Sequence, residues 1–172
     1  MNKLLFCICL TCCANTYAAT SATIDVSAVI EKGCLFQESA MGLDYGTHAT
    51  SSQESAVQAN IQNTSSTWNI ECTPDVPVSI SFSNGNYFDA STQFRRLKNT
   101  QSNHYIQYSL YSDNARTKLI GTAAPANSLS LKSTVSQHLL NFGVYGLVDL
   151  SQGAANKAAG DYADTVQITI SW

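Results

Sequence analysis

The feature that most constrains the fold of this chain is a repeated alternation of apolar and polar residues in short runs. It occurs in residues 22–30, in "HYIQYSLYSD" (104–113) and in the closing residues 166–172. Successive side chains of a β-strand point to opposite faces, so each run predicts a strand with one face toward a core. No stretch shows the periodicity of an amphipathic helix. The sequence therefore predicts an all-β protein.

Turn residues separate these runs at short intervals. Asn84-Gly85 ends one run, and the loop "SQGAANKAAG" (151–160) precedes the last one. Many short strands with turns between them are typical of an antiparallel sandwich or barrel. One longer strand is predicted in 137–150, where Gly143 and Gly146 indicate a bulge or a close approach of backbones. Further strands are expected within 57–61, 68–72, 78–82 and 128–133.

The first residues have the layout of a secretory signal peptide. Lys3 precedes an apolar run from Leu4 to Cys13, and Thr16 and Ala18 place small residues at the minus-three and minus-one positions of a cleavage site. A run of about ten residues is too short to span a bilayer, which argues against an uncleaved anchor. We expect cleavage after Ala18, so that residues 1–18 are the signal peptide. A lipoprotein site at Cys12 or Cys13 is the other alternative.

Loss of the signal peptide would leave only Cys34 and Cys72 of the six cysteines. Two cysteines in an exported protein usually pair, because the compartment is oxidising. A metal site is the alternative, but it needs further ligands. His48, His104 and His138 are scattered without a short ligand spacing. We therefore expect a disulfide and no metal.

Charge and motifs exclude several classes of function. Nine Lys and Arg oppose twelve Asp and Glu, so the net charge of −3 disfavours nucleic acid and anionic membranes as partners. The chain has no nucleophile elbow, no phosphate-binding glycine loop and no His-Glu-x-x-His. We expect no enzyme activity, no cofactor and no small-molecule substrate. The densest positive stretch, "RRLKN" (95–99), is expected to be the solvated start of a strand.

Once the signal peptide is removed, the chain would begin and end on amphipathic segments. An extended segment can complete the sheet of another molecule through backbone hydrogen bonds and alternate side chains. The first run is therefore either such a donor strand or the first strand of a self-complete sandwich. The apolar faces consist of Ala22, Ile24, Val26 and Ala28 in the first run and Val166, Ile168, Ile170 and Trp172 in the last.

A series of motifs covers nearly all of the chain beyond the signal peptide. It comprises "VSAVIEKGC", "LDYGTHA", "STWNIECTPDVPVSISFSNG", "RRLKN", "IQYSLYSDNARTKLIG", "FGVYGLV" and "AAGDYADTVQITISW". In their order and spacing these motifs resemble the spore coat protein U-like domain, the subunit type of archaic (Csu-type) chaperone–usher pili. Tyr45 and Leu97 depart mildly from the pattern, because the family more often has Phe and Met there.

The resemblance implies an immunoglobulin-like antiparallel sandwich over residues 33–172 that lacks one strand. Residues 19–32 would be the donor segment, with the first apolar face inserted into a neighbour. The last apolar face would contact a chaperone strand first and a donor strand later. We expect all four side chains of that last face to point toward the core.

The implied function is that of a structural pilus subunit assembled by donor-strand exchange, supporting surface attachment and biofilm formation. Its partners would be a periplasmic chaperone, an outer-membrane usher and neighbouring subunits, and it would reach the cell surface through the periplasm. A secreted spore or cyst coat protein, or a pilus-associated receptor-binding module, is the alternative; each would have a self-complete sandwich. The chain has room for only one domain and keeps a donor-like segment, and both features favour an internal subunit.

Overall fold

The computed structural model describes residues 23–36, 42–61, 69–153 and 156–172, so the predicted signal peptide and Ala22 lie outside the described residues. The chain divides into two units, Met1–Ile30 and Glu31–Trp172, which we describe separately. In the first unit, residues 23–30 form neither helix nor strand. The side chains of Ile24 and Val26 are 87% and 91% exposed. Residues 23–30 thus have the predicted alternation but no strand, because a strand needs the backbone of a partner.

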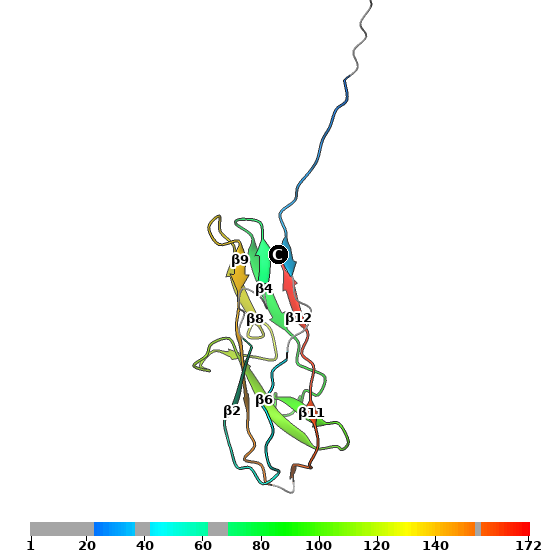
Figure 1. The fold of residues 1–172 in the computed structure, drawn as a ribbon, viewed down its shortest axis with the longest axis vertical. Helices are drawn as coiled ribbons and strands as arrows, with labels where there is room; N and C mark the ends of the chain where they lie inside the picture. The colour runs from blue at the N-terminus through cyan, green and yellow to red at the C-terminus, as the bar shows by residue number, and fades with distance from the viewer. Residues whose placement is uncertain (1–22, 37–41, 62–68, 154–155) are drawn as a thin grey trace, which may run out of the picture. The chain divides into compact units, whose positions relative to one another are not determined.

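The second unit is built from antiparallel strands in three sheets (Figure 1). Two sheets are three-stranded, in the orders β1-β3-β9 and β12-β4-β8, and one is ordered β11-β5-β6-β10-β2 with β7 beside β6. The strands are β1 (Cys34–Phe36), β2 (Val57–Ile61), β3 (Asn69–Cys72), β4 (Pro77–Phe82), β5 (Arg95–Asn99), β6 (Tyr105–Tyr111), β7 (Leu119–Ile120), β8 (Ser128–Lys132), β9 (Leu139–Asn141), β10 (Val144–Val148), β11 (Tyr162–Ala163) and β12 (Ile168–Ser171).

The all-β prediction is confirmed, and the alternation of residues explains why these strands share one core. Even-numbered residues of β4 and β6 are buried, and the residues between them are more exposed. The buried cluster draws side chains from all three sheets, with Phe82 and Phe142 in edge-to-face contact at 6.4 Å between ring centroids. Within the described part of the chain, no helix has the length and apolar character needed to span a bilayer.

The predicted disulfide is confirmed. Cys34 of β1 and Cys72 of β3 are opposite each other in the antiparallel register, with their Cα atoms 4.1 Å apart, and their sulfur atoms are bonded. The bond joins β1 to β3, whose other neighbour in the same sheet is β9.

The prediction of a single long strand in 137–150 is wrong. The structure has two strands there, because β9 pairs with β3 in one sheet whereas β10 pairs with β2 and β6 in another. The chain passes between the sheets at Phe142-Gly143. A Cβ on Gly143 would lie 2.8 Å from the Tyr145 ring, so the missing side chain makes room for that ring at the crossover.

The expectation that "RRLKN" is solvated is also wrong, because Arg95 and Asn99 are buried and the three residues between them are partly buried. Arg95 is only 2% exposed and lies on the core side of β5, opposite Tyr108 of β6. Its guanidinium donates hydrogen bonds to the carbonyl oxygens of Ser83 at 3.0 Å, Ile120 at 2.8 Å and Gly121 at 2.8 Å. Burial lowers the Arg95 pKa, and Tyr108 and Asp164 oppose that shift. Carbonyl acceptors thus take the place of solvent around this cation.

Candidate functional site

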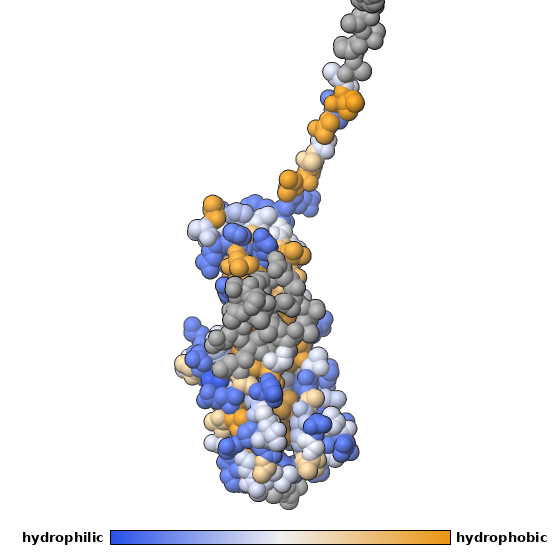
Figure 2. All heavy atoms as spheres, in the orientation of Figure 1, coloured by the Kyte–Doolittle hydropathy of each residue, from blue (hydrophilic) through white to orange (hydrophobic). Residues whose placement is uncertain are grey.

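A groove of about 1690 Å³ runs along the second unit. Its two walls are residues 42–50, which follow β1, and residues 157–168, which lead into β12. The two walls run lengthwise beside each other in the lower half of Figure 1. In Figure 2, which shows the second unit from the same side, hydrophobic residues lie between polar ones in this lower half.

The inner edges of both walls lack strand partners among the described residues. Residues 42–49 belong to no strand, and their backbone pairs with no strand of the described chain. The second wall pairs on one side only, through β11 with β5 and β12 with β4, and both strands are at the ends of their sheets. Unpaired strand edges offer rows of N–H and C=O groups to another chain.

The floor of the groove is the core of the sandwich itself. Its apolar side chains come from β4, β5, β6 and β10 and from Leu150, which follows β10, and most of them are buried against other core residues. Among the described residues, this floor lies between two backbone edges that pair with no strand, which is the form of a sandwich that lacks one strand. The floor residues are Phe82, Leu97, Ile106, Tyr108, Leu110, Val144, Val148 and Leu150.

The structure brings three of the four predicted last-strand residues to the expected place. Val166, Ile168 and Ile170 pack against the core, and the first two also line the groove. Trp172 lies beyond the end of β12 at Ser171 and is 61% exposed, so the expectation that it faces the core is wrong. The role of these residues in binding a chaperone or donor strand stays a prediction.

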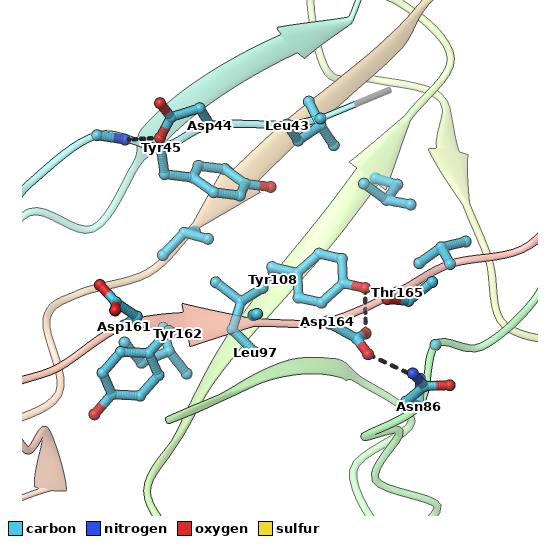
Figure 3. Close-up of a pocket in the computed structure, with 18 of the residues that line it drawn as sticks. Leu43, Asp44, Tyr45, Asn86, Leu97, Tyr108, Asp161, Tyr162, Asp164 and Thr165 are labelled. Atoms are coloured by element: carbon cyan, nitrogen blue, oxygen red, sulfur yellow. Dashed lines mark hydrogen bonds between the residues drawn. The ribbon is translucent and has the colours of Figure 1, made fainter. Parts of the chain in front are cut away.

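Sequence reasoning missed an inward-facing carboxylate in the second wall. Asp164 accepts a hydrogen bond from the Tyr108 hydroxyl at 2.6 Å and another from the backbone N–H of Asn86 at 2.8 Å (Figure 3). Burial and this bond to Asp164 raise the Tyr108 pKa. Gly85 has φ +81°, and a Cβ there would lie 2.1 Å from the Asp164 carboxylate, so only glycine fits beside it. A signal existed: Asp164 has the same parity as the inward-facing Val166.

Replacing Asp164 by Ala is expected to destabilise the second unit by about 2–3 kcal/mol, because the change leaves the Tyr108 hydroxyl and the Asn86 N–H without their acceptor. Urea unfolding of the purified subunit measures the effect. Asp161→Ala is the matched control, since Asp161 lies on the same wall with an exposed side chain. Equal unfolding midpoints for both variants would contradict the conclusion that the hydrogen bonds of Asp164 stabilise the second unit.

The first wall is held by side-chain contacts in place of a backbone ladder. A ring nitrogen of His48, Nε2, lies 2.7 Å from the Tyr45 carbonyl oxygen, and Nδ1 lies 2.7 Å from a Glu54 carboxylate oxygen. The Gly46 N–H donates to the Asp44 carboxylate at 2.8 Å. Two of these contacts use main-chain groups of the wall, the Tyr45 carbonyl oxygen and the Gly46 N–H, so they occupy part of the edge with which an incoming strand would pair.

The groove offers surfaces for strand pairing. Among the described residues, no group of three or more His, Cys, Asp or Glu is arranged to hold a metal ion. What the arrangement does present is an apolar floor with a backbone edge on each side, which is the environment of an inner strand of a sandwich.

Comparisons with known proteins agree with this architecture. The model of the Spore Coat Protein U domain matches residues 20–169. Protein U of Myxococcus xanthus is 30% identical over 167 residues, covering 90% of this chain and 86% of the relative. A solved structure also matches, with a TM-score of 0.53 and 17% identity. It is a chain in the crystal structure of the CsuC–CsuE chaperone–tip adhesion subunit pre-assembly complex, from the archaic chaperone–usher Csu pili of Acinetobacter baumannii.

The structural match covers 83% of this chain, which spans only 40% of the length of the solved chain. At this identity the match shows a shared fold, and it confirms the immunoglobulin-like sandwich predicted from the sequence.

Proposed function

Because the chain belongs to the Spore Coat Protein U domain family, as the sequence motifs indicated, we propose that it is a structural subunit of a chaperone–usher pilus assembled by donor-strand exchange. The observation that carries the proposal is the groove, in which an apolar floor lies between two unpaired backbone edges. The same chain also carries an exposed segment, residues 23–30, with the alternation that such a groove requires.

In this mechanism the donor segment of one subunit enters the groove of the next. Its backbone pairs with residues 42–50 on one side and with the second wall on the other, and Ala22, Ile24, Val26 and Ala28 cover the floor. Full burial of an Ile or Val side chain stabilises by about 1.5–3 kcal/mol, so Ile24 and Val26 dominate the apolar contribution. Release of the donor would expose this surface again, which makes dissociation slow.

The open groove also explains why the proposed pathway needs a carrier. An apolar floor with free strand edges promotes aggregation in an unaccompanied subunit. A periplasmic chaperone that lends a strand would cover the groove until an outer-membrane usher joins subunits at the cell surface. Surface attachment and biofilm formation by the fibre belong to this proposal as well, on family analogy.

A strand-exchange assay tests the proposal. The subunit is exported to a bacterial periplasm with and without an archaic-type chaperone, and a synthetic peptide of residues 20–32 is added to the purified complex. We expect the yield of soluble subunit to be much lower without the chaperone, and we expect replacement of the chaperone by the peptide to give a species of higher melting temperature. The matched control peptide carries Ile24→Asp and Val26→Asp.

The opposite result would favour a self-complete sandwich. If the subunit is a stable monomer alone and its melting temperature does not respond to either peptide, the groove accepts no strand. A secreted spore or cyst coat protein, or a receptor-binding module, would then be the better hypothesis.

A further inference from the structure

The hydroxyl of Tyr45 is an exception to the hydrogen-bonding pattern of the structure. Among the side chains that the structure describes, every other buried oxygen or nitrogen has a hydrogen-bond partner, and the Tyr45 hydroxyl has none. Buried polar groups are nearly always hydrogen-bonded, and leaving one without a partner is costly. Such an exception in a native structure calls for a reason, and its position suggests one.

Tyr45 lies in the first wall, which pairs with no strand of the described residues. Its ring projects from this wall over the floor, on the side of Tyr108 (Figure 3). The hydroxyl packs onto β10 at Gly146, where a Cβ would lie only 2.2 Å from it. Gly146 therefore provides the space that the end of the ring occupies.

The electrostatic surroundings of the hydroxyl offer no substitute for a partner. Burial raises the Tyr45 pKa, and the nearby Arg116 opposes the shift only in part. Arg116 itself donates from Nε to the Gly146 carbonyl oxygen at 3.2 Å. The hydroxyl is thus neutral, desolvated and unsatisfied while the groove is open.

We infer that Tyr45 is a specificity-determining residue of the groove, whose hydroxyl gains its hydrogen-bond partner only when a donor strand from a second copy of this chain is inserted. This inference rests on the proposed function. The first wall has no backbone ladder with any described strand, so a donor that pairs with it would run beside Tyr45. A donor carbonyl has two lone pairs, and one remains for the phenol when the other serves the strand ladder.

The inference predicts opposite effects of Tyr45→Phe on two states. In the open groove the phenylalanine removes an unsatisfied hydroxyl, so the stability of the open subunit stays equal or rises. In the filled groove it removes a hydrogen bond. The donor therefore binds about 5- to 150-fold more weakly, which is the change in affinity that corresponds to the free-energy cost of leaving one buried polar group without a partner. A side chain that only packs would change both states alike and leave the affinity constant.

The test uses the full exported chain carrying Val26→Asp, which is expected not to fill its neighbour's groove. The dissociation constant of a labelled peptide of residues 20–32 is measured by fluorescence polarisation for this chain and for the same chain with Tyr45→Phe. Urea unfolding without peptide reports the open state. Tyr111→Phe is the matched control, because Tyr111 lies on the face of β6 opposite the core residues and outside the groove.

Weaker binding by the Tyr45→Phe chain alone, with unfolding midpoints equal or higher, is the expected result. Equal peptide affinities of the chains with and without Tyr45→Phe would overturn the inference while leaving donor-strand exchange intact. Failure of the tyrosine-containing chain to bind the peptide at all would overturn the proposed function, and this inference with it.

Discussion

A subunit carrying Val26→Asp is expected to bind its chaperone normally but to be absent from fibres. Val26 is central in the apolar face of the proposed donor and is 91% exposed in the free segment, so the change costs nothing before insertion. Insertion would bring a carboxylate over the apolar floor without a partner. Burying an unpaired charge costs several kcal/mol, in addition to the ~1.5–3 kcal/mol lost with the valine. The measurement is the yield of sedimentable polymer from cells that also express chaperone and usher.

The neighbouring residue provides a control of equal charge. Ser27 is on the opposite face of the alternation, so Ser27→Asp would keep its carboxylate in water at the outer side of the inserted strand. We expect fibres from this variant at close to the normal yield. Fibres of normal amount and length from Val26→Asp would show that these residues are not the donor.

Local alternation was sufficient to predict most of the strands. In β4 and β6 every second residue faces the core, and a period of two is visible within a few residues of sequence. The disulfide was predictable for a different reason, since cleavage of the predicted signal peptide would leave only two cysteines. Neither inference required knowledge of how distant segments meet.

Features that depend on distant segments were not predictable in this way. Arg95 looks like a surface cation, but the carbonyls of Ser83, Ile120 and Gly121 meet around it only in the folded sheets. The crossover between β9 and β10 likewise depends on which sheets their partners belong to. Alternation also cannot tell whether the partner of a strand lies in the same chain or in another. For that reason residues 22–30 were compatible with both a donor and a first strand.

The groove was the least predictable feature, because it is defined by pairing that does not form. Residues 42–50 have few apolar side chains, and only Leu43 and Tyr45 mark an inward face. They follow β1 in the chain, and β1 consists of three residues paired with β3. The anchor of β1 therefore matters for the groove as well as for the fold.

Loss of the disulfide is the second large effect that we expect. The bond closes a loop with a sequence separation of 38 residues, which includes the whole first wall. In the chain-entropy model, removing a cross-link of that span costs about 4 kcal/mol, a large part of the stability of a small domain. The Cys34→Ala/Cys72→Ala subunit should therefore unfold at a much lower urea concentration than the oxidised parent, and its periplasmic yield should fall.

The reduced parent protein separates the bond from the side chains. Both sulfur positions are packed into or against the core, so alanine also removes some apolar contact. Reduction removes the bond but keeps the sulfur atoms, and most of the loss should appear there already if the cross-link itself stabilises β1. The difference between the reduced parent and the double variant then measures packing alone. A reduced parent with the unfolding midpoint of the oxidised protein would mean that strand pairing of β1 with β3 suffices to hold the first wall.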